Sequence, residues 1–261
     1  MKLSFDHLVH IVNRPEDAIE NFAAIGLKAS LGGRHENWGT YNALSYFDLC
    51  YIEFLGIFDR EKAEKMKEND LVVQTMKLLP HFEGFSRIAL RTNNINEISN
   101  LLQSKGIKIK GPIKGERKRD DGKMLHWEML FINEKIGGIP FPFIIQWNIE
   151  DDIRREDIES MNNHRQLNEL VFAVENYEKA AARWSEVFQL KMRKSYKDKK
   201  LKANCILLEL NGCNLVFASP YSQGEISRII ETKGEGPFLL KISNNNIVLE
   251  KEMFGGYYQF V

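Results

Sequence analysis

The chain has 261 residues, of which 43% are hydrophobic and 28% charged, as is usual for a soluble globular protein. Lysine plus arginine and aspartate plus glutamate number 36 each, so the formal net charge is zero. This balance gives no support to general binding of nucleic acid or of a membrane surface. No apolar run approaches the ~18 residues of a membrane span, and the first residues lack the pattern of a signal peptide.

The three cysteines, Cys50, Cys205 and Cys213, form an odd set without CxxC spacing. This argues against a disulfide framework or a zinc knuckle and predicts reduced thiols in a cytoplasmic protein. Cys50 lies within a strand pattern, so we expect a small core residue there and not a nucleophile.

The first unit of the chain begins with an apolar strand, "FDHLVHIV", and continues with an amphipathic helix over Pro15–Ala24. A polar loop, "GGRHENWGT" (32–40), and an alternating strand, "LCYIEFLGIF" (49–58), complete the unit. Glu53 lies in the most apolar part of that last strand. A buried carboxylate costs several kcal/mol unless it is compensated, so Glu53 predicts a cation or a substrate beside it.

A second unit follows with the same order of elements. It contains the strand "FSRIALRT" (85–92), a helix over Ile95–Lys105, and the strands "KMLHWEMLFI" (123–132) and "FPFIIQWNI" (141–149). The charged run "KGERKRDDGK" (114–123) between them mixes both signs, so we interpret it as a solvated hairpin tip. "NEKIGGIP" (133–140) is expected to be a second hairpin connection.

The carboxyl-terminal part repeats this pattern. The segment 167–192 again predicts a strand and a helix, Tyr177–Phe188, and superposition puts Glu169 on His7 and Val216 on Glu53. A shorter copy ends the chain at 236–243 and 257–261. We therefore predict an α+β fold of four strand–helix–three-strand units, the last one truncated.

The polar stretch 150–166 separates the two pairs of units and is expected to be a linker or a short helix. This predicts a first domain over 1–149 with the main cavity and a degenerate second pair over 167–261. Because Val216 cannot bind metal and Lys241 can pair with Glu169, we expect the second pair to be structural.

Alternate residues of a strand share a face, and each helix must cover one face of its sheet. The other face is then expected to collect polar residues from four apolar strands. His7, Glu53, Arg87 and Gln146 occupy two pairs of equivalent positions, and Tyr51 lies two residues before Glu53. The pattern predicts that these side chains meet in one cavity.

The loop "GGRHENWGTYNAL" (32–44), the strand "YIEFL" (51–55) and the opening "DHLV" (6–9) resemble the vicinal oxygen chelate superfamily, in particular its glyoxalase-like branch. Glyoxalase I, extradiol dioxygenases and bleomycin-resistance proteins belong to this superfamily. The resemblance implies paired βαβββ modules whose strands curl around a cavity. In the superfamily that cavity usually holds a divalent metal.

The resemblance places His7, Glu53 and Gln146 at metal-ligand positions. Arg87 is a departure, because a histidine is often found there and a guanidinium cannot ligate metal. Two alternatives stay open. Either a divalent metal (Mn, Fe, Zn or Ni) is bound while Arg87 faces substrate, or no metal is bound and Arg87 pairs with Glu53 or with an anionic ligand. We favour the second.

Two functions follow from this pattern. One is a lyase, isomerase or dioxygenase-like enzyme for a small oxygenated substrate, with Glu53, His7 and Arg87 as its catalytic residues. The alternative is a metal-free protein that binds an anionic small molecule or a drug. Either would act as a monomer or a homodimer. Further candidates for substrate binding are His35, Asn42, Tyr51, His126, Trp127 and Glu128.

Overall fold

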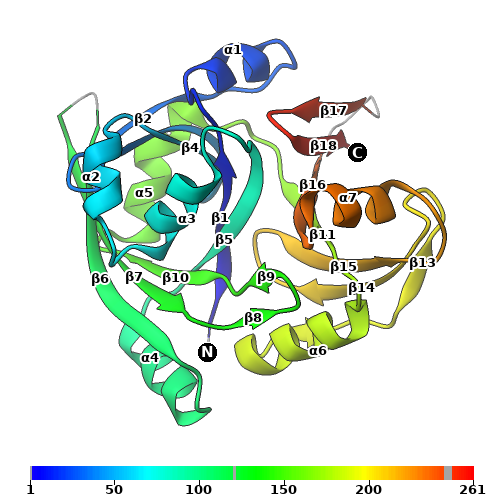
Figure 1. Cartoon of the computed structure of the whole chain (residues 1–261). Coiled ribbons are helices and arrows are strands. Elements are labelled where there is room, and N and C mark those ends of the chain that lie inside the picture. The colour runs from blue at the N-terminus through cyan, green and yellow to red at the C-terminus, as the bar shows by residue number, and fades with distance from the viewer. Residues whose placement is uncertain (1, 120–121, 244–248) are drawn as a thin grey trace.

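The computed structural model describes residues 2–119, 122–243 and 249–261, and it has the predicted α+β class. Strands β1 to β7 and β10 close into a barrel, and an open sheet built from the second half of the chain packs beside it (Figure 1). The order around the barrel is β1-β4-β3-β2-β6-β7-β10-β5. Each barrel unit contributes one strand, one helix and three further strands.

The first barrel unit consists of β1 (Ser4–Ile11), α1 (Asp17–Ala23), β2 (Ser30–His35), β3 (Thr40–Phe47) and β4 (Cys50–Ile57). The second consists of β5 (Gly84–Arg91), α4 (Ile95–Ser104), β6 (Ile109–Lys118), β7 (Met124–Ile132) and β10 (Phe143–Trp147). The short strands β8 (Lys135–Ile136) and β9 (Ile139–Pro140) pair within the predicted hairpin connection.

Strands β1 and β4 of the barrel are buried on both faces. Leu8 and Phe54 face outward and pack with Phe22 of α1, whereas Val9 and Leu55 face the barrel interior. Period-two alternation therefore sends neighbouring residues of one strand to different cores.

Two helices that the sequence analysis did not predict, α2 (Arg60–Lys65) and α3 (Asp70–Leu78), follow β4. Asp59 and Asn69 cap their amino termini, and Leu71 and Val72 of α3 pack into the barrel interior. Helices this short depend on tertiary packing for stability, which explains why local sequence did not reveal them.

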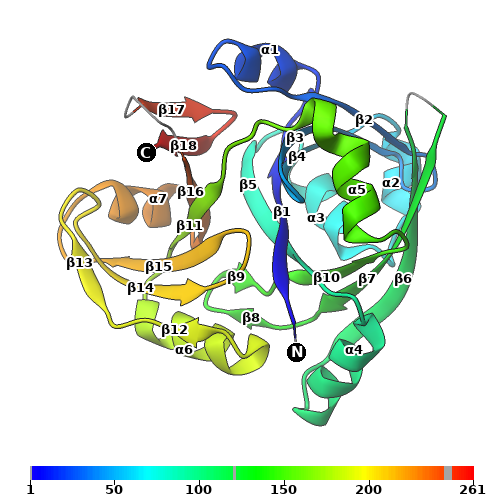
Figure 2. The ribbon, with the colours of Figure 1, turned by 180° about the vertical axis from the view of Figure 1, so that it is seen from behind.

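Residues 150–166 form a helix and not only a linker. They contain α5 (Asp151–Ile158) and a 3₁₀ turn (Glu159–Met161), and Arg154 and Ile158 of α5 are buried. Figures 1 and 2, which view the molecule from opposite sides, show α5 on the side of the barrel opposite α2 and α3.

The second half has the sheet order β12-β14-β15-β11-β16-β18-β17, with β13 paired to β14. Glu169 pairs with Asn214 and Val171 with Val216, in the register in which His7 pairs with Tyr51 and Val9 with Glu53. The equivalence of these positions is thereby confirmed. The elements are β11 (Leu167–Ala173), α6 (Tyr177–Phe188), β12 (Lys191–Met192), β13 (Tyr196–Asp198), β14 (Ala203–Glu209), β15 (Asn214–Pro220), α7 (Glu225–Lys233), β16 (Gly236–Ile242), β17 (Leu249–Met253) and β18 (Gly256–Phe260).

Helix α7 fills the concave face of the second sheet. Its Ile226 and Ile229 pack against Val171, Val216 and Phe238. Lys241 donates to Glu169 at 2.8 Å, as the sequence suggested. The space that the barrel keeps for a cavity is thus occupied by the protein's own side chains in this half.

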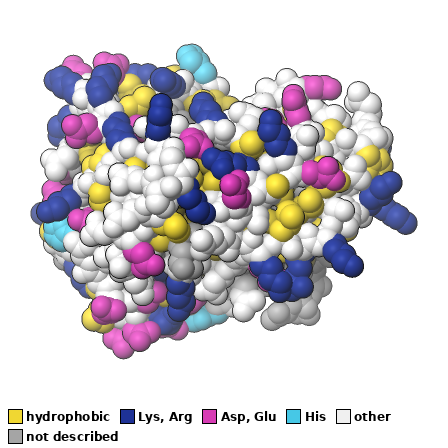
Figure 3. All heavy atoms as spheres, turned by 90° about the horizontal axis from the view of Figure 1, so that it is seen from below, with side chains coloured by type: hydrophobic (Ala, Val, Ile, Leu, Met, Phe, Trp, Pro, Cys, Tyr) yellow, Lys and Arg dark blue, Asp and Glu magenta, His cyan; other side chains and the backbone are white. Residues whose placement is uncertain are grey.

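The surface and the cysteines agree with the composition. Acidic and basic side chains are interspersed on the face shown in Figure 3. No helix within the described residues is long and apolar enough to cross a membrane. Cys50, Cys205 and Cys213 are all free thiols and buried, and burial raises the pKa of Cys50 to about 12, as fits a core residue.

Candidate active site

A small cavity lies inside the barrel, between β1, β4, β6, β7, β10 and helix α3. Its polar lining includes His7, His35, Glu53, Asn69 and Arg117. The rest of the wall is mainly apolar and aromatic. The space open to the centre of a water molecule is about 30 Å³, enough for about two or three water-sized positions.

His7 is held on two sides in the cavity wall. Its Nδ1 lies 2.7 Å from Asp6 Oδ1, which a register shift between Phe5 and His7 brings beside it. The imidazole stacks on Tyr51, with ring centroids 4.5 Å apart and planes at 22°. His7 Nε2 faces Glu53 Oε2 at 3.5 Å, so both candidate residues of the first unit meet as predicted.

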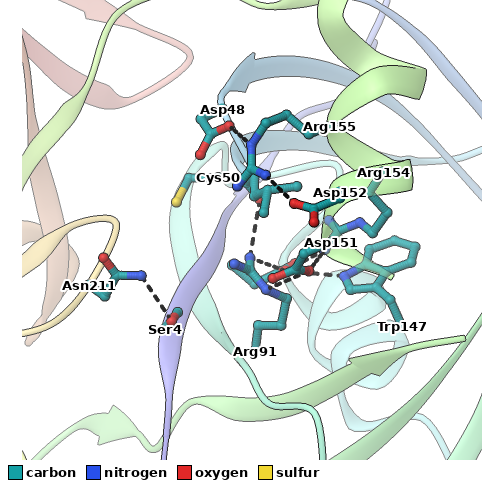
Figure 4. Close-up of polar contacts among 12 residues, drawn as sticks. Ser4, Asp48, Cys50, Arg91, Trp147, Asp151, Asp152, Arg154, Arg155 and Asn211 are labelled. Atoms are coloured by element: carbon teal, nitrogen blue, oxygen red, sulfur yellow. Dashed lines mark hydrogen bonds and ion pairs between the residues drawn. The ribbon is translucent and has the colours of Figure 1, made fainter. Parts of the chain in front are cut away.

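Asp6 is fully buried and collects several donors. Trp147 Nε1 and Arg91 Nη1 donate to its Oδ2 at 3.1 and 3.3 Å, and Arg154 lies 3.7 Å away. Figure 4 shows the side chains of Arg91, Trp147 and Arg154 close to one another. Burial alone would raise the pKa of Asp6, but the hydrogen bond with His7 and the charges of Arg154 and Arg91 hold this pKa well below its usual value.

The ionised state of Asp6 determines the tautomer of His7. A carboxylate only accepts hydrogen bonds, so His7 Nδ1 carries the proton that it donates to Asp6. His7 Nε2 is then the nitrogen that faces Glu53. Glu53 Oε2 is its neighbour there, and the Asp6, His7 and Glu53 side chains form a continuous chain.

Asn42 bridges the Glu53 carboxylate and the guanidinium of Arg117, which is its compensating cation. Asn42 Nδ2 donates to Glu53 Oε1 at 2.6 Å, and Asn42 Oδ1 accepts from Arg117 Nη1 at 3.3 Å. Because Asn42 is 1% exposed, this bridge lies in low dielectric, where such bonds are strong. Asn42 therefore orients the carboxylate.

Arg87 does not pair with Glu53, contrary to one of the alternatives. Both residues flank Val9 in the barrel, but the Arg87 guanidinium donates to the carbonyl oxygens of Phe141 and Ile132, at 2.9 and 3.4 Å. It also lies over the Phe131 ring. Burial lowers the pKa of Arg87 to about 10. This arginine ties β5 to the β7 and β10 connection.

Gln146 is on the outer face of β10 and does not line the cavity. Phe143, Ile145 and Trp147 line it instead, while Gln146 Oε1 accepts from the backbone N–H of Ile95 at the start of α4, at 2.7 Å. The sequence analysis placed β10 one residue out of phase, and a one-residue shift moves every side chain to the other face.

His35 lines the cavity as a neutral imidazole. Its Nδ1 lies 2.9 Å from Thr40 Oγ1, and its ring contacts Trp38 and Trp127. Burial, and then the charges of Arg117 and His7, lower the pKa of His35 to about 3. His35 therefore stays uncharged at neutral pH and fixes the "GGRHENWGT" loop against the wall.

His126 and Glu128 lie on the outer face of β7, and only Trp127 of this strand segment lines the cavity. The His126 side chain is 51% exposed and lies 3.8 Å from Glu116 of the neighbouring strand. The structure thus places His126 and Glu128 in a solvated cross-strand group outside the cavity, contrary to the prediction that they bind substrate.

Arg117 and Asn69 are polar cavity residues that sequence reasoning missed. Arg117 belongs to the charged run 114–123, which was interpreted as a solvated hairpin tip. The structure shows that this run is part of β6 as far as Lys118. Residues 120 and 121 of the run lie outside the described residues. Gly115 and Arg117 are the buried residues at its end, so alternation within β6 could have found Arg117. Asn69 gave no local signal, because it reaches the cavity through the unpredicted helix α3.

A family model described as a glyoxalase-like domain matches residues 5–188 of the chain. The chain belongs to the glyoxalase-like domain family. This confirms the resemblance to the vicinal oxygen chelate superfamily. The match includes the barrel with its cavity, helix α5 and the first strand and helix of the second half.

Solved structures share the fold of this glyoxalase-like protein. A hypothetical protein from Staphylococcus aureus is 22% identical, with a TM-score of 0.83, and the match covers 99% of both chains. A mutant of 4-hydroxymandelate synthase from Streptomyces coelicolor is 10% identical, with a TM-score of 0.61, covering 94% of this chain and 72% of that one. No curated protein matches the chain.

The residues of this glyoxalase-like barrel do not fit a tightly bound transition metal. His7 Nε2 and Glu53 Oε2 are two suitable donors 3.5 Å apart, but catalytic zinc sites take three protein ligands. The positions expected to add ligands hold Arg87 and Gln146, which face elsewhere. In the part of the chain that the structure describes, no three His, Cys, Asp or Glu side chains are grouped to hold a metal.

Proposed function

We propose that this glyoxalase-like protein is an enzyme that isomerises a small oxygenated substrate by proton transfer in the barrel cavity, with Glu53 as the base. The observation that carries the proposal is the chain of Asp6, His7 and Glu53 ending in an enclosed cavity. Two titratable groups within reach of each other in a partly apolar site are typical of acid–base catalysis.

The proposed step needs no co-reactant. Glu53 takes the proton from a hydroxyl-bearing carbon next to a carbonyl group, and the electron pair moves onto the carbonyl oxygen to give an enediolate. Glu53, oriented by Asn42, then returns the proton to the former carbonyl carbon while the hydroxyl proton passes to the other oxygen, or it returns the proton to the opposite face of the same carbon after the intermediate has turned in the cavity. Preorganised donors in the cavity stabilise the enediolate oxygen. Protons and electrons balance, so the reaction is an isomerisation or an epimerisation.

The alternative function, the binding of a drug-sized molecule, has less support. Pockets for such ligands have volumes of about 300–1,000 Å³. The space of about 30 Å³ in this cavity favours a substrate of a few heavy atoms.

The first test is hydrogen exchange in D₂O, because it detects proton abstraction without knowledge of the product. Small 2-hydroxy and 2-oxo carbonyl compounds are incubated with the protein, and loss of the carbon-bound proton is followed by NMR. We expect Glu53→Gln to lower the exchange rate by about 100-fold or more, in the range that general-base catalysis contributes. Glu128→Gln is the matched control, since Glu128 lies on the outer face of β7.

Full exchange activity in the Glu53→Gln variant would contradict the proposal. Equal loss in Glu53→Gln and Glu128→Gln would show a general effect on the fold and would likewise count against Glu53 as the base. A binding protein would instead be stabilised by a ligand in proportion to occupancy, with no exchange.

A further inference from the structure

The cavity holds two buried hydrogen-bond donors that the acid–base chain does not use. They are Asn69 Nδ2 of the α3 cap and Arg117 Nε of β6, and both side chains line the cavity. Asn69 is 0% and Arg117 5% exposed. Among the described residues, neither atom has a hydrogen-bond acceptor.

The orientation of the Asn69 amide is set by the helix that it caps. Its Oδ1 accepts from the backbone N–H groups of Leu71 and Val72, at 3.0 and 3.3 Å. A rotated amide would put its NH₂ group against these donors and lose the cap, so Nδ2 must be the atom left over. Leu71 and Val72 line the same cavity, which places the amide beside it.

Arg117 is already anchored at one end of its guanidinium. Its Nη1 donates to Asn42, which fixes the plane of the group and leaves Nε buried without an acceptor among the described residues. Among the described residues that line the cavity, Arg117 is the only lysine or arginine, and Glu53 is the only aspartate or glutamate. A guanidinium with a fixed plane matches the two oxygens of a carboxylate.

A buried donor without an acceptor is costly, so native structures rarely keep one without a role. Two such donors of like character on one small cavity call for acceptor oxygens from a ligand. We propose that Arg117 and Asn69 form a subsite for the carboxylate of a small substrate. Glu53 and His7 then face the reacting carbon of that substrate. This inference rests on the proposed function and specifies its substrate class, a 2-oxo or 2-hydroxy carboxylate of a few heavy atoms.

The test measures binding, separately from turnover. Affinities of pyruvate and glycolate are compared with those of pyruvamide and glycolamide, which have the same shape without the charge, by ligand-observed NMR and calorimetry. We expect the carboxylates to bind about tenfold or more tightly than the amides, since hydrogen bonds to charged groups are the stronger ones. Arg117→Gln and Asn69→Asp should remove that preference.

Asn69→Asp is the sharper variant, because aspartate caps a helix as well as asparagine but replaces the amide donor with a carboxylate oxygen. Asn176→Asp, the same change at the exposed cap of α6, is its control and should leave binding unchanged. Glu53→Gln should still bind the carboxylates.

Equal affinity for acids and amides, or no binding of either carboxylate up to about 50 mM, would overturn the subsite and assign both donors to water. Unchanged preference in Asn69→Asp and Arg117→Gln would also overturn it. Carboxylate binding without hydrogen exchange would reject the proposed function and leave the subsite standing. Hydrogen exchange that is equally fast for the acids and for the amides would reject the carboxylate subsite and leave the proposed function standing.

Discussion

At the scale of single residues, His10 shows how a histidine can be purely structural. It is 0% exposed, its Nε2 donates to the carbonyl oxygen of Phe254, and its Nδ1 accepts from the Tyr258 hydroxyl. Burial lowers the pKa of His10 to about 4, although the hydrogen bond to Phe254 acts in the opposite direction. His10 is therefore neutral in the folded protein and takes up a proton readily only after unfolding.

This depressed pKa makes a prediction about stability and pH. Between about pH 6.5 and pH 4 the unfolded chain binds more protons than the folded one, so stability falls as the pH falls, by roughly 1.4 kcal/mol per unit for His10. In His10→Gln this contribution is absent, and denaturant titrations should give a slope against pH that is smaller by about that amount. His126→Gln, at an exposed position, should keep the wild-type slope. An unchanged slope in His10→Gln would contradict the assignment.

The residues of the site differ in how clearly the sequence indicates their positions. His7 and Glu53 were predictable because alternation puts them on one face of strands whose register the repeat confirms. Gln146 was assigned to the wrong face of β10. This strand is apolar on both faces, so its sequence does not show which alternate residues face the cavity. Arg117 and Asn69 depend on where a charged strand ends and on a short helix, and tertiary contacts decide both.

At the scale of elements, helix α5 reaches the active site through the buried side chain of Arg154. Arg154 stacks over Trp147 at 4.3 Å and lies near Asp6, while the adjacent Arg155 pairs with Asp48 and Asp152 at the surface (Figure 4). The segment that was predicted to be a linker or a short helix thus helps to keep ionised the Asp6 carboxylate, which orients His7.

The two neighbouring arginines allow a matched comparison. Arg154→Met should lower the free energy of unfolding by about 3 kcal/mol, because it removes a buried partner of a buried carboxylate. Arg155→Met should change it by less than about 1 kcal/mol, since exposed ion pairs contribute little. Chemical denaturation monitored by tryptophan fluorescence measures both values. Similar effects of the two changes would show that α5 is held by surface contacts alone.

At the scale of the whole molecule, the two halves share a hydrophobic core. Phe54 and Phe85 of the barrel and Tyr258 of the second sheet belong to one cluster. The Phe85 ring meets the Tyr258 ring edge to face, and the Phe54 ring meets that of Phe254, between β17 and β18, in the same way. The solved structure from Staphylococcus aureus has the same fold over 99% of both chains, so this arrangement of barrel and second sheet occurs there too. The second half, filled by α7, packs against the outer face of β1 and β5.

A shared core predicts that the barrel and the second sheet unfold together. Tyr258→Phe leaves His10 Nδ1 buried without its donor and should cost about 1–3 kcal/mol, or about 2–4 °C in Tm for each kcal/mol. Calorimetry should show one transition that moves as a whole, because loss of this contact weakens both halves at once. Tyr257→Phe, which removes a hydroxyl that accepts from Arg228 at the surface, should leave the Tm nearly unchanged. A second transition that keeps its wild-type temperature in Tyr258→Phe would instead mean that each half is stable by itself, and the barrel cavity would then not depend on the second sheet.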